Sequence, residues 1–271
     1  MRATSSSALA RAQERWEPVL REAGESGRAY GEQLFAVVDL LDGEHALLRA
    51  LTEPAHAPED RARLAERVLG AKVDDAVADL VGGLVRDRWS AADDLLEASE
   101  SLGVISVLAA AEHAGRLEDV EDELYRLSRI LDAERELLLA LSARERTEDE
   151  RARLVTTLLE GKVGPESLVL AVRAATTPRS HDVAHLLHAM TEQAAGRRQR
   201  LVASVTSAVP LTEQQRSRLA RILSRQHGRE VEVHVDLDPD VVGGMRVQVQ
   251  DSVVDATLAS RLADARRRLA G

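Results

Sequence analysis

The strongest constraint on the fold of this chain is an internal repeat. Residues 31–73 match residues 121–163 at a constant offset of 90 residues, without a gap. The two lysines of the chain, Lys72 and Lys162, are equivalent under this offset. The run at residues 61–64 recurs as residues 151–154. Other identities include Leu34 with Leu124, Leu41 with Leu131, Leu47 with Leu137, Leu48 with Leu138, Leu51 with Leu141 and Leu69 with Leu159. One structural unit is therefore expected to occur twice.

Both copies have the periodicity of amphipathic helices. Apolar residues recur at positions i, i+3, i+4 and i+7, as in Leu34, Val37, Val38 and Leu41. This spacing predicts a helix that buries one stripe, whereas a strand would alternate. With 2% aromatic residues and abundant leucine and alanine, the composition also favours helices.

Breaks and caps divide each copy into short helices. The apolar pattern is interrupted at residues 42–43 and 53–54, and Pro58 then marks a helix start. At the equivalent place in the second copy, Thr147 and Glu150 form a capping-box pattern. Each copy is expected to be a bundle of short antiparallel helices that bury their stripes against one another.

The composition argues against several classes of function. The formal net charge is −10, so we expect no nucleic-acid partner. The chain has no cysteine, which excludes disulfides, thiolate nucleophiles and cysteine-ligated metals. It has no run of 18 apolar residues and no apolar signal core near its start, so no direct membrane insertion is expected.

The pattern changes near Leu201, where a third unit begins. A β-branched run ends before Pro210, and Thr212 is placed to cap a helix over residues 213–226. Residues 230–238 then alternate, which predicts a strand. Its buried face would carry Val231, Val233, Val235 and Leu237.

A glycine-containing turn follows this strand. Pro239, Gly243 and Gly244 mark the turn, and residues 245–249 resume the alternation, so the sequence predicts a hairpin. A last helix is expected over residues 258–269. We therefore predict a mainly α protein, with helical domains at residues 1–104 and 105–200 and a small α+β domain with a short sheet at residues 201–271.

The spacing in this third unit resembles the C-terminal signature of the ATP synthase delta subunits. The mitochondrial members of that family confer oligomycin sensitivity. Gln250 and the pair at residues 256–257 depart from the pattern, which implies a slightly different turn. The long form, with a second helical copy in front of the family's usual one, is similar to actinobacterial delta subunits. The matching residues are Leu211, Thr212, Gly228, Asp238, Pro239, Gly243, Gly244, Arg246, Asp255 and Arg261.

The resemblance implies a connector without catalytic, cofactor or metal residues. In this family the chain is a stator subunit, present once per complex, that links the catalytic head to the peripheral stalk. It thereby resists rotor torque during proton-driven ATP synthesis. Its expected partners are alpha subunits of the head and b-type stalk subunits, and its expected location is the cytoplasmic face of the plasma membrane, as a peripheral protein.

The resemblance also implies where the head binds. In this family the first and fifth helices of the helical domain form the contact surface. In the second copy the predicted contact residues are Val107, Leu108, Ala111, Leu168, Ala171 and Val172. The first copy offers residues 8–19 and 77–85 instead, and both copies remain candidates.

Other motifs suggest weaker alternatives. His181, His185 and His188 have a spacing that could hold a metal on a helix. A helix capped by Ser180, with Asp182 in its first turn, explains the same residues without a metal. A metal hydrolase is one alternative function, and a soluble helical adaptor or scaffold is another.

Glycines, arginines and tryptophans in the chain have structural explanations. Gly243 and Gly244 lack the Lys-Ser/Thr of a phosphate loop and are better explained by a tight turn. The arginine run at residues 266–268 fits the last turn of a helix. Trp16 and Trp89 are interpreted as core or interface anchors.

Overall fold

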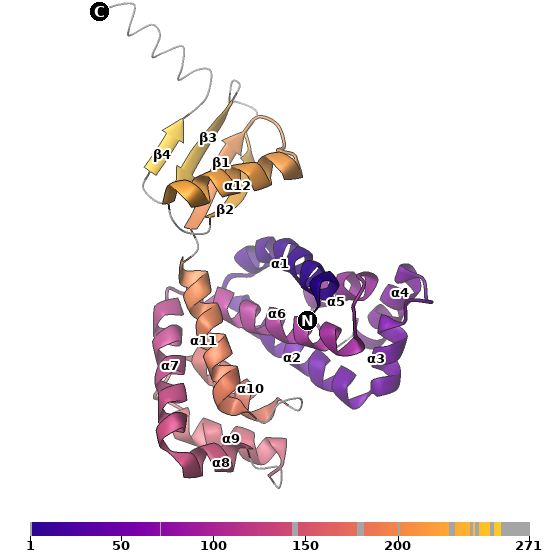
Figure 1. Cartoon of the computed structure of the whole chain (residues 1–271), viewed down its shortest axis with the longest axis vertical. Helices are drawn as coiled ribbons and strands as arrows, with labels where there is room; N and C mark the ends of the chain where they lie inside the picture. Colours follow the sequence, from indigo (N-terminus) through magenta and orange to yellow (C-terminus); the bar gives the residue numbers. More distant parts are fainter. Residues whose placement is uncertain are drawn as a thin grey trace, which may run out of the picture. The chain divides into compact units, whose positions relative to one another are not determined.

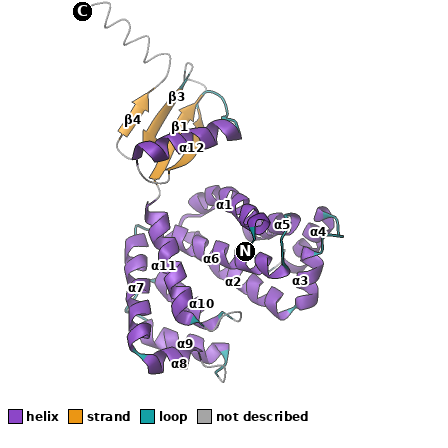
Figure 2. Cartoon of the chain, viewed as in Figure 1, coloured by secondary structure: helices purple, strands orange, loops and turns teal. Residues whose placement is uncertain are grey.

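The computed structural model of this chain divides into two compact units, Met1–Ala195 and Gly196–Gly271, which are described separately. It describes residues 2–70, 72–142, 146–177, 182–199, 201–227, 231–238, 241, 244–249 and 252–255. The first unit is helical and the second combines strands with a helix (Figure 2). The predicted fold class, mainly α with a small α+β unit at the end, is confirmed.

The helical unit consists of successive short helices joined by tight connections (Figure 1). The first part contains α1 (Ala3–Ala23), η1 (Gly24–Ser26), α2 (Gly27–Gly43), α3 (His45–Thr52), α4 (Pro58–Leu69), α5 (Asp75–Arg86) and α6 (Ala92–His113). The second part contains α7 (Leu117–Ala133), α8 (Arg135–Ser142), α9 (Glu148–Leu159), α10 (Pro165–Thr176) and α11 (Val183–Gln199). The predicted breaks after residues 43 and 52 and the helix start at Pro58 are confirmed.

The structural repeat is longer than the sequence match. The bounds of α2, α3, α4 and α5 recur in α7, α8, α9 and α10 after adding 90 to each number. Helix α1 corresponds in the same way to the last 21 residues of α6. Helix α6 therefore ends the first copy and begins the second, and the predicted boundary between residues 104 and 105 falls inside it.

Two hydrophobic clusters meet on α6. Leu95, Leu102 and Ala109 of α6 belong to the cluster of the first copy. Val104 and Val107 of the same helix belong to the cluster of the second copy. A helix that is buried on opposite sides needs no polar face on either of them. This explains why buried residues occur all around α6.

The repeated arginines at positions 61 and 151 close the ends of helices. Both side chains are 4% exposed. Arg151 Nε donates to the carbonyl oxygen of Ala175 at 2.7 Å, and Arg61 Nη2 donates to that of Arg86 at 3.4 Å. Because the last carbonyls of a helix lack intrahelical partners, a cation there satisfies them and favours the helix dipole. The repeated arginine is thus a structural element of each bundle.

Two other predictions about single residues are confirmed. Thr147 accepts a hydrogen bond from the Glu150 backbone while the Glu150 carboxylate accepts one from the Thr147 backbone, which completes the capping box. Trp16 is 2% exposed, and its Nε1 donates to Ser106 Oγ at 2.8 Å. Trp16 is therefore a core anchor of the first copy.

The second unit contains a four-stranded sheet and one described helix. Its elements are β1 (Leu201–Ser207), α12 (Glu213–His227), β2 (Val231–Leu237), β3 (Met245–Val249) and β4 (Ser252–Asp255). The strand order is β2-β1-β3-β4. β1 is parallel to β2 and antiparallel to β3, and α12 provides the crossover that parallel neighbours require.

The predicted hairpin between residues 230–238 and 245–249 is wrong. β1 lies between these two strands and pairs with both of them. Alternation predicts which face of a strand is buried, but it carries no information about the neighbouring strand. The hairpin of this sheet is β3–β4, and the predicted helix at 258–269 lies outside the described residues.

The core of this unit is small and aliphatic. Ala203, Val205 and Leu223 are at most 7% exposed and pack with Val231, Val233 and Val247. Leu237, which alternation assigns to the buried face, is 57% exposed because it lies at the last position of β2. Thr212 caps α12 as predicted, since its Oγ1 accepts from Gln215 N at 3.3 Å and Gln215 Oε1 accepts from Thr212 N at 2.9 Å.

Candidate binding surfaces

The structure buries most of the contact residues predicted in the second copy. Val107, Leu108, Ala111 and Ala171 are each at most 2% exposed and belong to the hydrophobic cluster of that copy. Leu168 and Val172, both on α10, are half-buried. On this face, therefore, Leu168 and Val172 are the predicted contacts that retain accessible surface.

Helix α2 of the first copy packs closely on α6. A Cβ placed on Gly31 would lie 2.5 Å from Val107 Cγ2 and 2.7 Å from the carbonyl oxygen of Gly103. A Cβ placed on Gly103 would lie 2.5 Å from Phe35 Cε1. The two glycines thus let the helix backbones approach, and Phe35 enters the cluster of the second copy.

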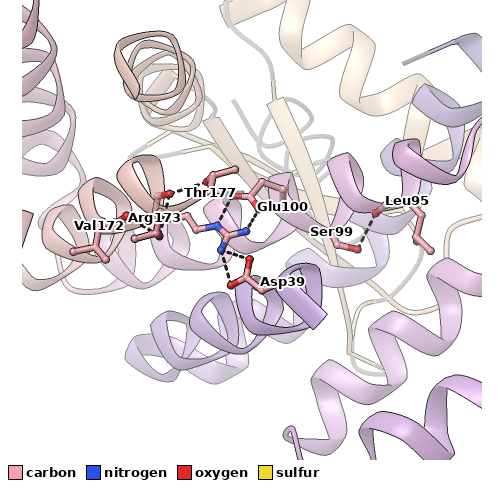
Figure 3. A network of polar contacts seen from close by, with 8 residues as sticks. Asp39, Leu95, Ser99, Glu100, Val172, Arg173 and Thr177 are labelled. Atoms are coloured by element: carbon pink, nitrogen blue, oxygen red, sulfur yellow. Dashed lines mark hydrogen bonds and ion pairs between the residues drawn. The ribbon is translucent and has the colours of Figure 1, made fainter. Parts of the chain in front are cut away.

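Arg173 ties three helices together at the same place (Figure 3). Its guanidinium donates two hydrogen bonds to Glu100 of α6, at 2.8 and 2.6 Å, and two to Asp39 of α2, at 2.7 and 2.9 Å. It also lies 4.9 Å from the centroid of the Phe35 ring. Burial lowers the pKa of Arg173, but the hydrogen bonds and charges of Glu100 and Asp39 outweigh this effect and raise it. The cation is 4% exposed and permanently charged.

These contacts place α2 against the side of α6 that carries Val107. The resemblance assigns this side of α6, together with α10, to a partner. In this chain part of that surface is used within the molecule, through Phe35 and the Arg173 ion pairs. No sequence motif signals this arrangement, because Asp39 and Arg173 are 134 residues apart.

The corresponding face of the first copy has a different chemistry. Arg173 and Glu100 are replaced there by Gly83 and Ala10. A Cβ on Gly83 would meet Arg15 Nη2 of α1 at 3.5 Å, which is ordinary contact. Arg15, in turn, pairs with Asp87 at 3.3 Å while its own side chain remains 49% exposed. The α1–α5 face therefore carries the partly exposed Arg15 beside Gly83, where the α6–α10 face has the buried and ion-paired Arg173.

The histidines do not form a cluster of metal ligands in the described residues. His185 and His188 are exposed, and His188 Nε2 lies 3.5 Å from Glu192 Oε1. His181 and Ser180 lie outside the described residues. The cap of α11 is Asp182, whose Oδ1 accepts from His185 N at 3.0 Å, so the prediction that Asp182 lies in the first turn is wrong by one position.

The signature residues of the second unit build its turns. Leu211 packs against the apolar cluster, and Asp238 N donates to the Ser207 carbonyl at 3.0 Å. Gly244 has a φ of 88°, a value that side chains rarely adopt, which supports the tight turn predicted there. Arg246 lies in β3 and Asp255 ends β4. Gly228, Pro239, Gly243 and Arg261 lie outside the described residues.

Comparison with known proteins decides the family. The family model of the ATP synthase delta (OSCP) subunit matches residues 105–269. ATP synthase subunit delta of Beutenbergia cavernae is 55% identical over 271 residues and that of Streptomyces griseus is 42% identical, each with all of both chains covered. The chain belongs to the ATP synthase delta (OSCP) family. It is thus a non-catalytic, structural subunit of an F-type ATP synthase.

Further comparisons extend this picture of the delta chain. ATP synthase subunit delta of Kineococcus radiotolerans is 43% identical over 97% of this chain and 95% of its own length. The predicted long actinobacterial form is thereby confirmed, because relatives of this kind match the first helical copy as well. A chain of the mitochondrial ATP synthase hexamer of Toxoplasma gondii covers 62% of this chain and 95% of itself, with 18% identity and a TM-score of 0.28, which is too low to carry a structural argument.

Within the described residues, no helix combines the length and the apolar character needed to cross a bilayer.

Proposed function

We propose that this delta chain is the stator connector between the catalytic head and the peripheral stalk. Family membership carries the proposal, and the division into two compact units supports it. When one chain binds both partners, the first contact raises the effective concentration for the second, so the connection between head and stalk persists under torque. The head would otherwise turn with the central shaft and lose the energy of the ion gradient.

We further propose that the first copy, through α1 and α5, contacts an alpha subunit. The support is the chemistry of the two equivalent faces. In the second copy, Arg173 and Phe35 join α2 to α6 and α10. In the first copy, the position of Arg173 is Gly83, and the neighbouring Arg15 is 49% exposed, so this face has a more accessible surface for an amphipathic helix laid between helices.

Leu168 and Val172 define the competing site on the second copy. Both are half-buried on α10, so they retain some accessible surface. A polar substitution at either position is expected to weaken head binding if the second copy also contributes. The two copies can therefore be compared directly.

The stalk contact is proposed for the second unit. On α12, Leu223 faces the sheet while Ile222 is 51% exposed. Arg221 and Arg225 are exposed on the same helix. An exposed apolar residue flanked by cations suits a stalk helix that presents apolar and acidic residues. The chain would thus be held at the cytoplasmic face of the plasma membrane by its partners, once per complex.

A pull-down with the purified head complex tests the choice of copy. Gly83→Arg gives the first copy the side chain that the second copy has at this position, and a Cβ there would be in ordinary contact with Arg15 Nη2 at 3.5 Å. We expect this variant to lose head binding by at least tenfold, while Val172→Glu retains it. Loss with Val172→Glu and retention with Gly83→Arg would assign the contact to the second copy instead.

A further inference from the structure

An open apolar pocket lies in the second helical copy. Its volume is about 380 Å³. Residues of α7, α8 and α9, together with Lys162 and Val163 after α9, form most of its walls, and Ala171 of α10 with Val183 and Leu187 of α11 complete it. The floor contains Leu131 and Leu187, each 0% exposed, and Ile130 and Leu158 stand at its edge, 49% and 37% exposed.

The large exposed hydrophobic residues of the described helical unit gather in this region. They are Tyr125, Ile130, Leu139 and Leu158, with exposures of 55%, 49%, 57% and 37%. All four belong to α7, α8 or α9. Monomeric proteins tolerate scattered apolar residues, but a pocket with an exposed apolar edge marks an interaction site.

The first copy does not expose apolar residues at the equivalent positions. Ile130 corresponds to Leu40 and Leu158 to Val68, and both of these are half-buried against the cluster of the first copy. Tyr125 corresponds to Phe35, which is 6% exposed. The exposed apolar edge is therefore a feature of the second copy and not a general consequence of the repeated bundle.

The surroundings of the pocket are acidic. The described residues between 117 and 162 include 12 acidic and 7 basic side chains. One of the bases, Arg151, is buried and donates to backbone carbonyls. Another, Arg126 at the pocket edge, is paired with Asp122 at 3.3 Å. The charged residues of the lining itself are Glu123, Arg126 and Lys162. Because Arg126 is paired, Glu123 and Lys162 balance each other there, and the acidic excess of the surrounding segment favours a partner with cationic residues.

We infer that this pocket docks an amphipathic helix of another protein, with large aliphatic residues on one face and basic residues beside them. A helix fits because the walls are themselves helices and the exposed edge residues extend the apolar surface beyond the cavity. This docking site is separate from the head and stalk contacts proposed above. It uses neither the α1–α5 face nor the second unit.

A labelled probe peptide tests the inference on the full chain. The probe is a 16-residue fluorescein-labelled helical peptide with leucines at i, i+3, i+4 and i+7 and lysines elsewhere. A matched peptide carries glutamates in place of the lysines. Fluorescence anisotropy is expected to show saturable binding of the basic peptide, at least tenfold tighter than that of the acidic one, and weaker binding at high salt.

Matched variants locate the binding site. Ile130→Glu combined with Leu158→Glu changes two edge residues of the pocket and should lower the affinity for the basic peptide by at least tenfold. Tyr125→Glu combined with Leu139→Glu adds the same charge at exposed apolar residues that do not line the pocket. This control pair should leave affinity within about twofold. Circular dichroism verifies that each variant is folded.

A charge variant keeps the test decisive if an edge variant does not fold. Lys162 lines the pocket, and Lys162→Glu should raise the affinity for the basic peptide because it removes a like charge. The inference is overturned by no saturable binding, by equal binding of the two peptides, or by equal losses in both variant pairs. It is also overturned if sedimentation shows that the edge residues mediate self-association, because the occupant would then be a second copy.

Discussion

Arg173 shows at the residue scale how one side chain joins the two copies. It is 4% exposed, while its partners Glu100 and Asp39 are 18% and 44% exposed. Such a cation is costly to bury unless its hydrogen bonds are complete. The local caps at Thr147 and Thr212 could be predicted because their partners lie three residues away. The Arg173 cluster could not, because its partners are brought together by packing.

Removal of this guanidinium should destabilise the helical unit. We expect Arg173→Met to lower the free energy of unfolding by about 2–3 kcal/mol, because Glu100 would lose its charged partner in a largely buried site. Urea unfolding followed by circular dichroism measures the change. Arg126→Met is the control, since that arginine and its partner Asp122 are 74% and 63% exposed. Its expected cost is below about 0.5 kcal/mol, and equal costs for the two variants would contradict this account.

Glu166 makes stability depend on pH. Burial raises the pKa of its carboxyl, but the hydrogen bonds from Arg116, at 2.6 and 3.2 Å, outweigh burial and hold the pKa below its ordinary value. A lowered carboxyl pKa stabilises the fold above the pKa of the unfolded chain, about 4.3, and this stability is lost as the pH falls through the folded value.

We therefore expect wild-type stability to fall more steeply than that of Glu166→Gln when the pH is lowered below about 4.3. Thermal unfolding at a series of pH values measures this difference. At neutral pH the variant should be less stable than the wild type, because Arg116 loses its ionic partner. Parallel pH curves for the two proteins would show that the carboxylate contributes nothing to the pH dependence.

At the element scale, α6 determines how the copies are joined. The sequence match covers residues 31–73 and 121–163, and α1, α6 and α11 lie outside it. The match therefore predicted repeated helices, but it did not predict that the two copies share α6. The close approach of α2 depends on Gly31 and Gly103. Glycine inside a helix ordinarily lowers the stability of the helix, but here the close packing of α2 on α6 leaves no space for a Cβ.

Gly31→Ala should be destabilising although alanine is the better helix former. The added methyl group would meet Val107 Cγ2 at 2.5 Å and a backbone oxygen at 2.7 Å, and the backbone cannot easily move. Overpacking of this kind costs about 1–3 kcal/mol. Gly43→Ala is the control, because a Cβ there has no neighbour within 4 Å. Urea unfolding should show a loss for Gly31→Ala and no loss for Gly43→Ala, and a gain in both would contradict the packing argument.

The sheet of the second unit shows a limit of sequence analysis at the same scale. The alternation at residues 231–237 and 245–249 predicted two strands. The pairing of these two strands, β2 and β3, could not be predicted, because the β1–α12–β2 crossover places β1 between them. A short turn between two strands is consistent with a hairpin, but pairing is decided by the whole sheet.

At the scale of the whole molecule, the family and its role as a subunit could be predicted from about sixty C-terminal residues. The contact residues stay a prediction, and Val107, Leu108 and Ala111 also belong to the hydrophobic core of the second copy. An apolar stripe on a helix has the same sequence whether it is covered by the chain or by a partner.

Proton pumping in membranes depleted of this chain tests the stator role most directly. The proposal predicts that the head still hydrolyses ATP without the delta chain, that ATP-driven proton pumping is lost, and that pumping returns when the full chain is added back. ATP hydrolysis and acidification are measured in the same vesicles. Proton pumping that is equally strong before and after the chain is added back would contradict the account.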